Sequence, residues 1–429
     1  MSSSKLLLKA SGRDGELQVT MEQMEVTTVD ALKRIEDGEG RNVLHRAAEA
    51  GALQNVRFLV NEVGFPVSLR DAKYKTPLMY AVKFPDILRV LLAAGASPSE
   101  FKANSWTPLH YAAKCGETDS VQQLLDSGAD ASAQNKEGAS ALYVAAREGC
   151  VDAVRCLLAS AAPSVQAYAP AELAAAAEGG EGGAGTAAGQ THTMVDLPVD
   201  EAARVGALVT QTTLRGRTPL HAAVLGGNAS VLRLLLKALR SAGYEPLCDV
   251  LRDIVDASGQ SLQHEATDAG SAECAQVLAG QGGLGGWPPH VAPDAAGRLP
   301  IHTACLRGNA DMLKWLLETA PVDGAGGAAF PDEGGSTALY HACCSGAQRC
   351  VELLLAAGAD PAQGNPRRPA IYIAALNGHV DAVQACTAAL LGAGMQVTDV
   401  QQLKDAEGQV LIHSITADMR KALGWDGEQ

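Results

Sequence analysis

The stretch that decides the fold is residues 106–113, which read Trp-Thr-Pro-Leu-His-Tyr-Ala-Ala. Thr107 can N-cap a helix, and Pro108 suits the first helical turn, where no amide donor is needed. Apolar and small residues then follow on one helix face at i, i+3, i+4 and i+7, namely Leu109, Ala112, Ala113 and Gly116. The stretch therefore predicts a short helix whose small residues let a neighbouring helix approach closely.

The same pattern recurs along the chain when it is counted from the position of His110. Small residues follow this anchor at plus two and plus three, and glycine follows at plus six. The anchors from His45 to Tyr143 are 34, 31 and 33 residues apart. The anchors found in this way are His45, Met79, His110, Tyr143, His221, His264, His302, Tyr340 and Tyr372. A single helix pair cannot bury its apolar face alone, so neighbouring pairs are predicted to stack.

This unit resembles the ankyrin repeat, a β-turn followed by two short helices with a period of about 33 residues. The resemblance implies an all-α solenoid of helix pairs with β-turn or hairpin loops, about ten repeats long with degenerate caps. It also implies that the histidine of the anchor column hydrogen-bonds around the loop and caps its own unit. That column contains His45, His110, His221, His264, His302 and His413.

The repeats and their irregularities predict five segments. Residues 1–39 form a degenerate N-terminal capping repeat and lead-in, 40–162 carry repeats, 163–213 form a degenerate repeat, 214–387 carry repeats with lengthened loops, and 388–429 form a C-terminal helical segment and truncated cap. In the degenerate repeat a Gly/Ala-rich flexible insertion at Gly179–Gly189 precedes a second helix expected at Asp200–Val209. At the C-terminal end, Gly408 to His413 begin a unit that the chain is predicted not to finish.

One early repeat has a shortened period, because only 31 residues separate Met79 from His110. Phe84 and Pro85 occupy the turn between its helices, where the other units carry glycine. Proline can begin a helix, so the second helix is expected to start early at Pro85. A local bend of the stack is the predicted consequence.

Composition and charge narrow the class of partner. The net charge of -14 argues against a general nucleic-acid binder. It is compatible with basic protein partners, although solubility alone also explains an acidic surface. No apolar run reaches the roughly 18 residues of a spanning helix. The ten cysteines show no paired metal spacing and suggest buried thiols in a reducing compartment, so a cytoplasmic or nuclear location is expected.

The sequence offers no constellation for catalysis. The glycine run at Gly179–Gly185 lacks the Lys-Ser/Thr of a phosphate-binding loop, and no nucleophile elbow or paired metal-binding histidines are present. The cluster of Cys343, Cys344 and Cys350 lacks a matched pair of ligands nearby. No catalytic residue, cofactor, metal or small-molecule substrate is therefore expected, and an enzyme would need a pocket assembled from repeats.

The resemblance implies that a partner meets the concave face formed by turn tips and first helices. By register, the candidate partner-binding tips are Tyr74, Lys75, Trp106, Lys136, Arg215, Arg217, Arg298, Arg367 and Arg368. Aromatic and arginine side chains are enriched at binding hot spots, but each tip also has a structural interpretation. The lengthened loops at Ser241–Val255, Gly280–Pro293 and Ala320–Asp332 favour a partner-specific surface after residue 210, or tolerated surface drift.

Two functions fit this pattern. The leading hypothesis is a non-catalytic scaffold that binds another protein along a rigid groove. The alternative is a targeting or substrate-recognition adaptor within a larger assembly, for which the segment Ala388–Lys404 is a candidate docking element. Fold does not determine function, so the sequence leaves the partner open.

Overall fold

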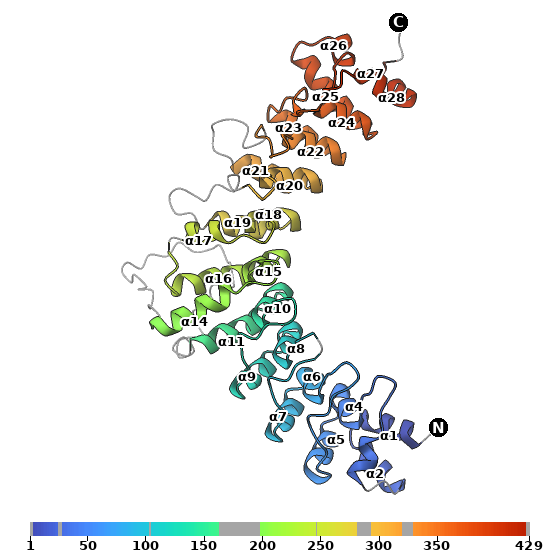
Figure 1. Cartoon of the computed structure of the whole chain (residues 1–429), viewed down its shortest axis with the longest axis vertical. Coiled ribbons are helices and arrows are strands. Elements are labelled where there is room, and N and C mark those ends of the chain that lie inside the picture. Colours follow the sequence, from blue (N-terminus) through green and yellow to red (C-terminus); the bar gives the residue numbers. More distant parts are fainter. Residues whose placement is uncertain are drawn as a thin grey trace, which may run out of the picture. The chain divides into compact units, whose positions relative to one another are not determined.

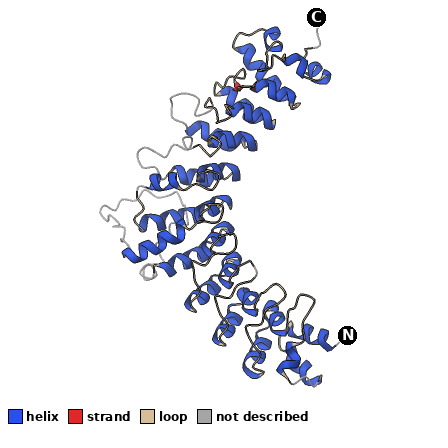
Figure 2. Cartoon of the chain, in the orientation of Figure 1, coloured by secondary structure: helices blue, strands red, loops and turns tan. Residues whose placement is uncertain are grey.

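The computed structural model describes residues 3–24, 28–102, 104–162, 198–245, 247–280, 293–319 and 329–425. The chain forms two compact units, Met1–Tyr244 and Glu245–Gln429. Both are built from short helices joined by tight turns, and β-structure among the described residues is limited to one two-stranded hairpin and isolated bridges (Figure 2).

In the first unit, helix pairs stack in two layers (Figure 1). The first helices are α4 (Val43–Ala50), α6 (Pro77–Tyr80), α8 (Pro108–Cys115), α10 (Ala141–Glu148) and α15 (Pro219–Leu225). The second helices are α5 (Leu53–Arg57), α7 (Pro85–Ala93), α9 (Thr118–Asp126), α11 (Val151–Ala161) and α16 (Ala229–Ser241). A π-helical turn, η1 (Phe58–Glu62), extends α5, and a 3-10 turn, η2 (Ala81–Lys83), extends α6. Each first helix packs on the first helix of the next pair.

The second unit repeats this arrangement. Its first helices are α18 (Leu262–Ala269), α20 (Pro300–Arg307), α22 (Ala338–Ser345) and α24 (Ala370–Leu376). Its second helices are α19 (Ala272–Ala279), α21 (Ala310–Thr319), α23 (Gln348–Ala356) and α25 (Val380–Gly392). Strands β1 (Gly364–Asn365) and β2 (Arg368–Pro369) form the antiparallel hairpin that leads into α24. All nine sequence anchors therefore lie in first helices, as predicted; the total of about ten repeats stays a prediction.

The core follows the repeat columns. The residue before each anchor is an aliphatic side chain with at most 1 % exposure in α4, α6, α8 and α10, namely Leu44, Leu78, Leu109 and Leu142. The small residues at plus two, such as Ala47 and Ala112, are also completely buried. The packing between layers is thus made by Leu and Ala at fixed positions, as their spacing indicates.

Both ends of the described chain carry short helices. At the N-terminal end, α1 (Ser3–Ser11) and α2 (Glu16–Gln23) pack on α4 and α5, and α3 (Val29–Lys33) precedes the first turn. The buried Asn55 amide secures this pair by donating to Ala10 O and Arg13 O. At the other end, α26 (Val397–Gln401), α27 (Leu411–Ser414) and α28 (Ala417–Ala422) follow α25. α27 has four residues and α28 has six, and the truncated last unit stays a prediction.

The structure corrects the expected order of repeats in the middle of the first unit. α10 packs directly on α15, so the two repeats that the sequence separates by a degenerate unit are neighbours. The helix expected at Asp200–Val209 is present as α14 (Val199–Thr210), and it lies between α11 and α16 in the second layer. The tyrosine ring of Tyr244 packs over Gly206 of this helix. Leu173 and the insertion Gly179–Gly189 lie outside the described residues, and the boundaries of segment 163–213 stay a prediction.

Two other irregular regions can be compared with the sequence. α7 begins at Pro85, and Leu88 and Leu91 are buried, which confirms the early second helix. The associated bend stays a prediction. The long connection Ser241–Val255 contains α17 (Leu247–Asp253), whose Leu247 and Leu251 are buried, so part of this connection is packed structure. Most of the other two lengthened loops lies outside the described residues.

Candidate functional site

The anchor histidines form hydrogen bonds that join successive repeats. In His45 the Nδ1 atom accepts the backbone N–H of Asn42 at 3.3 Å, so the hydrogen is on Nε2, which donates to Lys75 O at 3.0 Å. His110 does the same with Thr107 N and Ala139 O, at 3.2 and 2.9 Å. Each ring therefore caps its own helix and also holds the turn of the next repeat, a link that the sequence alone did not predict.

The same geometry recurs at His264 and His302, whose Nε2 atoms donate to Arg298 O and Phe330 O. Burial lowers the pKa of His45, His110 and His264, and it lowers the pKa of His302 to about 4, with repulsion from His341 as a further cause. His221 also accepts the N–H of its cap residue, Thr218. The column is thus neutral and structural at these positions.

His413 is an exception to the column. Its side chain is exposed, and α27 is only four residues long. The other five histidines of the column are completely buried. His413 therefore differs in burial from the other column histidines, and its assignment to the structural column stays a prediction.

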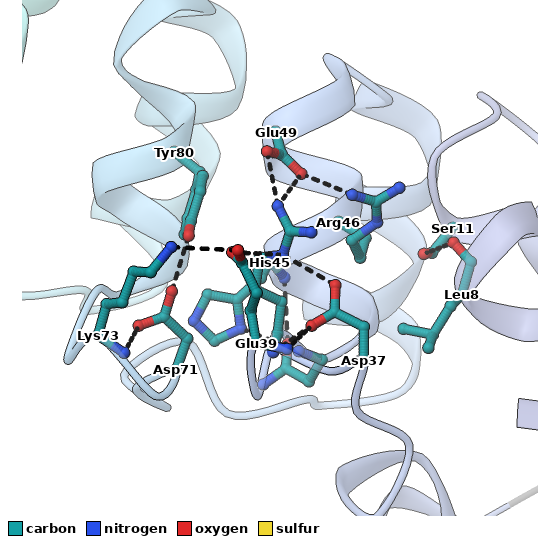
Figure 3. Close-up of polar contacts among 12 residues, drawn as sticks. Leu8, Ser11, Asp37, Glu39, His45, Arg46, Glu49, Asp71, Lys73 and Tyr80 are labelled. Atoms are coloured by element: carbon teal, nitrogen blue, oxygen red, sulfur yellow. Dashed lines mark hydrogen bonds and ion pairs between the residues drawn. The ribbon is translucent and has the colours of Figure 1, made fainter. Parts of the chain in front are cut away.

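The turns before the first helices are shaped by an acidic or amide side chain and a glycine. Asp71 Oδ1 accepts the N–H groups of Lys73 and Lys75, both at 2.8 Å, and Asp71 Oδ2 accepts the hydroxyl of Tyr80 at 2.7 Å. Figure 3 shows Tyr80 and Lys73 beside Asp71, with the Lys73 ammonium reaching Glu39 of the preceding turn at 3.1 Å. Equivalent side chains begin the turns at Asp37, Asn135, Asp256, Asp294, Asp332 and Asp405.

Neighbouring turns are joined by backbone hydrogen bonds. Ala72 N donates to Glu39 O, Lys136 N donates to Asn104 O, and Leu214 N donates to Glu137 O, at 2.9 to 3.0 Å. In the second unit Ala295 N, Glu333 N and Ala406 N make the equivalent bonds. Several neighbouring turns are therefore joined within each unit. Together with the first helices, the turns make the surface that we call the turn face.

Two consecutive turns of the first unit depart from this design. The position with positive φ is glycine in most of the other turns, for example Gly40, Gly138 and Gly216, but it is Tyr74 (φ 61°) and Ser105 (φ 59°) in these two. They are the only non-glycine residues with positive φ in the described part of the chain. Lys102 additionally replaces the acidic residue that opens the turn. A left-handed backbone costs a non-glycine residue about 1–2 kcal/mol, and such strain is concentrated at functional sites.

Aromatic and lysine side chains gather on the turn face at these two turns. The Lys75 ammonium lies 4.9 Å from the ring centroids of both Tyr80 and Tyr111. Lys102 lies 5.4 Å from Tyr111 and 5.7 Å from Trp106. The Trp106 and Tyr111 centroids are 5.2 Å apart, and Lys114 lies 5.9 Å from Trp106. We call Lys75, Tyr80, Lys102, Trp106, Tyr111 and Lys114 the ring–lysine cluster.

The sequence identified two members of this cluster, Lys75 and Trp106, and missed the others. Tyr80 and Tyr111 directly follow two anchors, and Lys114 lies four residues after His110 on the exposed face of α8. Lys102 could have been found from its place in the turn column that is acidic or amide in most other repeats. The sequence therefore did indicate Lys102, but finding it required aligning the turn residues of the repeats as well as their helix residues.

The remaining predicted tips do not form one site. Lys136 and Arg215 are exposed on their turns, and Arg217 is half-buried. In the second unit the Arg298 guanidinium bonds Asp294 Oδ2 at 2.7 and 2.9 Å within its own turn. Arg367 is exposed, and Arg368 lies 3.8 Å from the buried Asp405 carboxylate. Arg298 and Arg368 are thus engaged in intramolecular ion pairs, which weakens the interpretation of these two as free anchors.

The cysteine cluster offers no metal site. Cys343 Sγ lies 3.8 Å from Cys386 Sγ in the buried layer between α22 and α25. The contact with Cys386 and burial raise the pKa of the Cys343 thiol well above its usual value, and burial raises the pKa of Cys350 to about 11. No group of three or more His, Cys, Asp or Glu side chains within the described ranges could hold a metal ion. None of the helices that the structure describes is long and apolar enough to cross a membrane.

Comparison with protein families identifies the repeat. A model for three consecutive ankyrin repeats matches residues 17–102, 83–167 and 264–365, and a single-repeat model matches residues 215–242. The chain belongs to the ankyrin-repeat family. Ankyrin repeats are general protein–protein interaction modules, and proteins built from them are typically non-catalytic. A search of curated proteins returned no match.

The strained turn of this ankyrin-repeat protein gives a stability prediction. We expect Ser105→Gly to raise the free energy of unfolding by about 0.5–1 kcal/mol, because glycine adopts positive φ without the penalty of a side chain. The gain is less than the full cost of the strain because glycine also loses more entropy on folding. Urea denaturation of the two proteins measures the difference. Ser99→Gly is the matched control, and equal stability changes in both variants would contradict the assignment of strain to Ser105.

Proposed function

We propose that this ankyrin-repeat protein is a non-catalytic scaffold that binds a protein partner on the turn face of its first unit. The observation that carries the proposal is the ring–lysine cluster around Trp106. Its rings and ammonium groups remain half-buried or exposed rather than packed into the core. Large aromatic side chains that are partly exposed beside strained backbone are typical of binding hot spots.

The proposed surface lies in a different part of the chain from the partner-specific surface that the sequence suggested after residue 210. The lengthened loops favoured the part of the chain after residue 210, whereas the positive-φ turns at Tyr74 and Ser105 lie well before it. Long loops show where a repeat tolerates extra residues. Strained turns that carry rings and unpaired cations are the more specific sign of a binding surface, because they cost stability.

Replacing Trp106 tests the proposal. We expect Trp106→Ala to weaken partner binding by at least about tenfold, because a central aromatic anchor provides a large share of interface energy. The measurement is quantitative mass spectrometry of proteins recovered with the full chain, followed by titration of the most enriched partner. Phe330→Ala is the control, since Phe330 is a 64 % exposed aromatic residue in a turn of the second unit. Equal recovery with the wild type and Trp106→Ala would exclude this surface.

The adaptor alternative requires a constitutive partner and a surface to hold it. The segment Ala388–Lys404 contains the end of α25 and the whole of α26, which pack on each other with Val400 buried. Much of this predicted docking element therefore belongs to its own repeat stack. Light scattering on native extract distinguishes the two functions, since a free monomer of 44.3 kDa would argue against the adaptor. The described cysteines are free thiols, which supports a cytoplasmic or nuclear location for either function.

A further inference from the structure

The turn from Lys102 to Trp106 lacks both residues that shape the next turn along the chain, the amide Asn135 and the positive-φ glycine Gly138. Where Asp71 and Asn135 accept two backbone N–H groups, Lys102 has no acceptor atom to offer. Its place is partly taken by Asn104, whose Oδ1 accepts Trp106 N at a long 3.4 Å. Ser105 then adopts the positive φ that glycine supplies at Gly138. The turn therefore adopts the same backbone shape without the side-chain acceptor and without the glycine that stabilise the turn at Asn135.

Lys102 also adds a positive charge to this surface. Lys75, Lys102 and Lys114 all lie within 6 Å of ring centroids in the cluster, and two of them share the Tyr111 ring. None of the three forms an ion pair with a carboxylate in the described part of the chain. Neighbouring cations are neutralised instead, since Lys73 pairs with Glu39 and Arg70 pairs with Glu100. An anion bound at the cluster would gain Coulomb attraction from these ammonium groups, which no carboxylate of the described residues already neutralises.

We propose that the ring–lysine cluster binds an extended, carboxylate-rich segment of the partner protein, an inference that rests on the proposed function above. Carboxylate groups pair with the three ammonium groups, and the ring edges and faces pack against the methylene groups of glutamate side chains. The rings also fix the lysine side chains before binding, which reduces the entropy lost when the partner is bound.

The charge distribution favours a short acidic peptide over a nucleic acid. The whole chain has a net charge of -14, so a long polyanion would meet repulsion outside the cluster. Acidic residues flank the cluster in the sequence at Glu100 and Glu117. A local run of carboxylates fits a cationic patch of this size, whereas nucleic-acid binding relies on phosphate contacts over a longer track.

Three variants of the full chain with the same net charge test this inference. Lys102→Asp with Ser105→Gly restores the ordinary turn residues and removes one cation from the cluster. Lys102→Gln with Lys114→Gln removes two cations without restoring the turn. Lys9→Gln with Lys237→Gln is the control, because both lysines are exposed on helices outside the cluster. The probe is a fluorescein-labelled ten-residue oligoglutamate, compared by anisotropy with a ten-residue Gly-Ser peptide and a ten-nucleotide oligouridylate.

We expect the wild type and the control to bind oligoglutamate equally, and both cluster variants to bind it at least about tenfold more weakly. The variant with the restored turn should melt no lower than the wild type, so its loss of binding cannot result from unfolding. Absence of oligoglutamate binding by the wild type, equal binding by all variants, or tighter binding of oligouridylate would each overturn the inference. A partner whose binding depends on Trp106 but is unaffected by both cluster variants would leave the proposed function standing and refute only its acidic chemistry.

Discussion

Gly138→Ala is expected to lower the free energy of unfolding of the first unit by about 2–3 kcal/mol. Gly138 has φ 77°, and a Cβ atom there would lie 2.8 Å from Leu214 N and 2.9 Å from Thr213 Cα. Those atoms belong to the backbone of the next turn, so they cannot move aside without breaking the bond from Leu214 N to Glu137 O. Positive φ accounts for about 1–2 kcal/mol of the loss, and the weakened hydrogen bond for about 1 kcal/mol more.

Gly128→Ala separates the two causes. Gly128 has φ 87°, but a Cβ atom there would meet no other atom within 4 Å. We therefore expect this control to lose only the conformational part, about 1–2 kcal/mol. Hydrogen exchange of α15 amides measures the local effect, because solenoid repeats depend on their neighbours and need not unfold in one step. Equal losses of protection in the two variants would show that the hydrogen bond between these turns does not contribute to the stability of α15.

The first-layer helices were predictable because the information is local and repeated. Thr107 and Pro108 specify a helix start, Leu109 and Ala112 specify its buried face, and the same columns recur at the other anchors. The direct contact between α10 and α15 was not predictable, since Ala174 occupies the anchor column and helical spacing cannot show which helix belongs to which layer. Which layer a helix joins depends on its packing against distant parts of the chain, and the repeat period carries no information about that packing.

The candidate site was predictable only in part for a related reason. Trp106 and Lys75 occupy tip positions in register, so they could be found from the sequence. That Lys75 contacts the rings of Tyr80 and Tyr111 depends on the stacking of two successive repeats. Arg298 shows the reverse case, because its tip position suggested a free anchor and the structure pairs it with Asp294. Position along a turn is local information, whereas availability for a partner depends on the neighbouring side chains.

Acid is expected to destabilise the second unit through His302, starting near pH 6.5. The folded-state pKa of His302 is lowered to about 4, so the unfolded chain binds this proton more readily than the folded one. The stability contribution is fully present above about pH 6.5 and is lost as pH falls toward 4. Between pH 6.5 and pH 5 the loss is about 2 kcal/mol, at about 1.4 kcal/mol for each pH unit. The carboxylates of Asp294 and Asp332 have lowered pKa values and act in a separate, more acidic window.

His302→Gln isolates this contribution from the other titrating groups. Glutamine cannot titrate, so the variant should be less stable at pH 6.5 but should lose about 2 kcal/mol less than the wild type when the pH falls to 5. His264 is present in both proteins and its contribution largely cancels in the comparison. Hydrogen exchange of α20 amides at the two pH values, corrected for intrinsic exchange rates, gives both opening free energies. If the two proteins lose stability equally as the pH falls, protonation of His302 does not cause the loss. Its ring would then contribute to stability only through its hydrogen bonds to Leu299 N and Phe330 O.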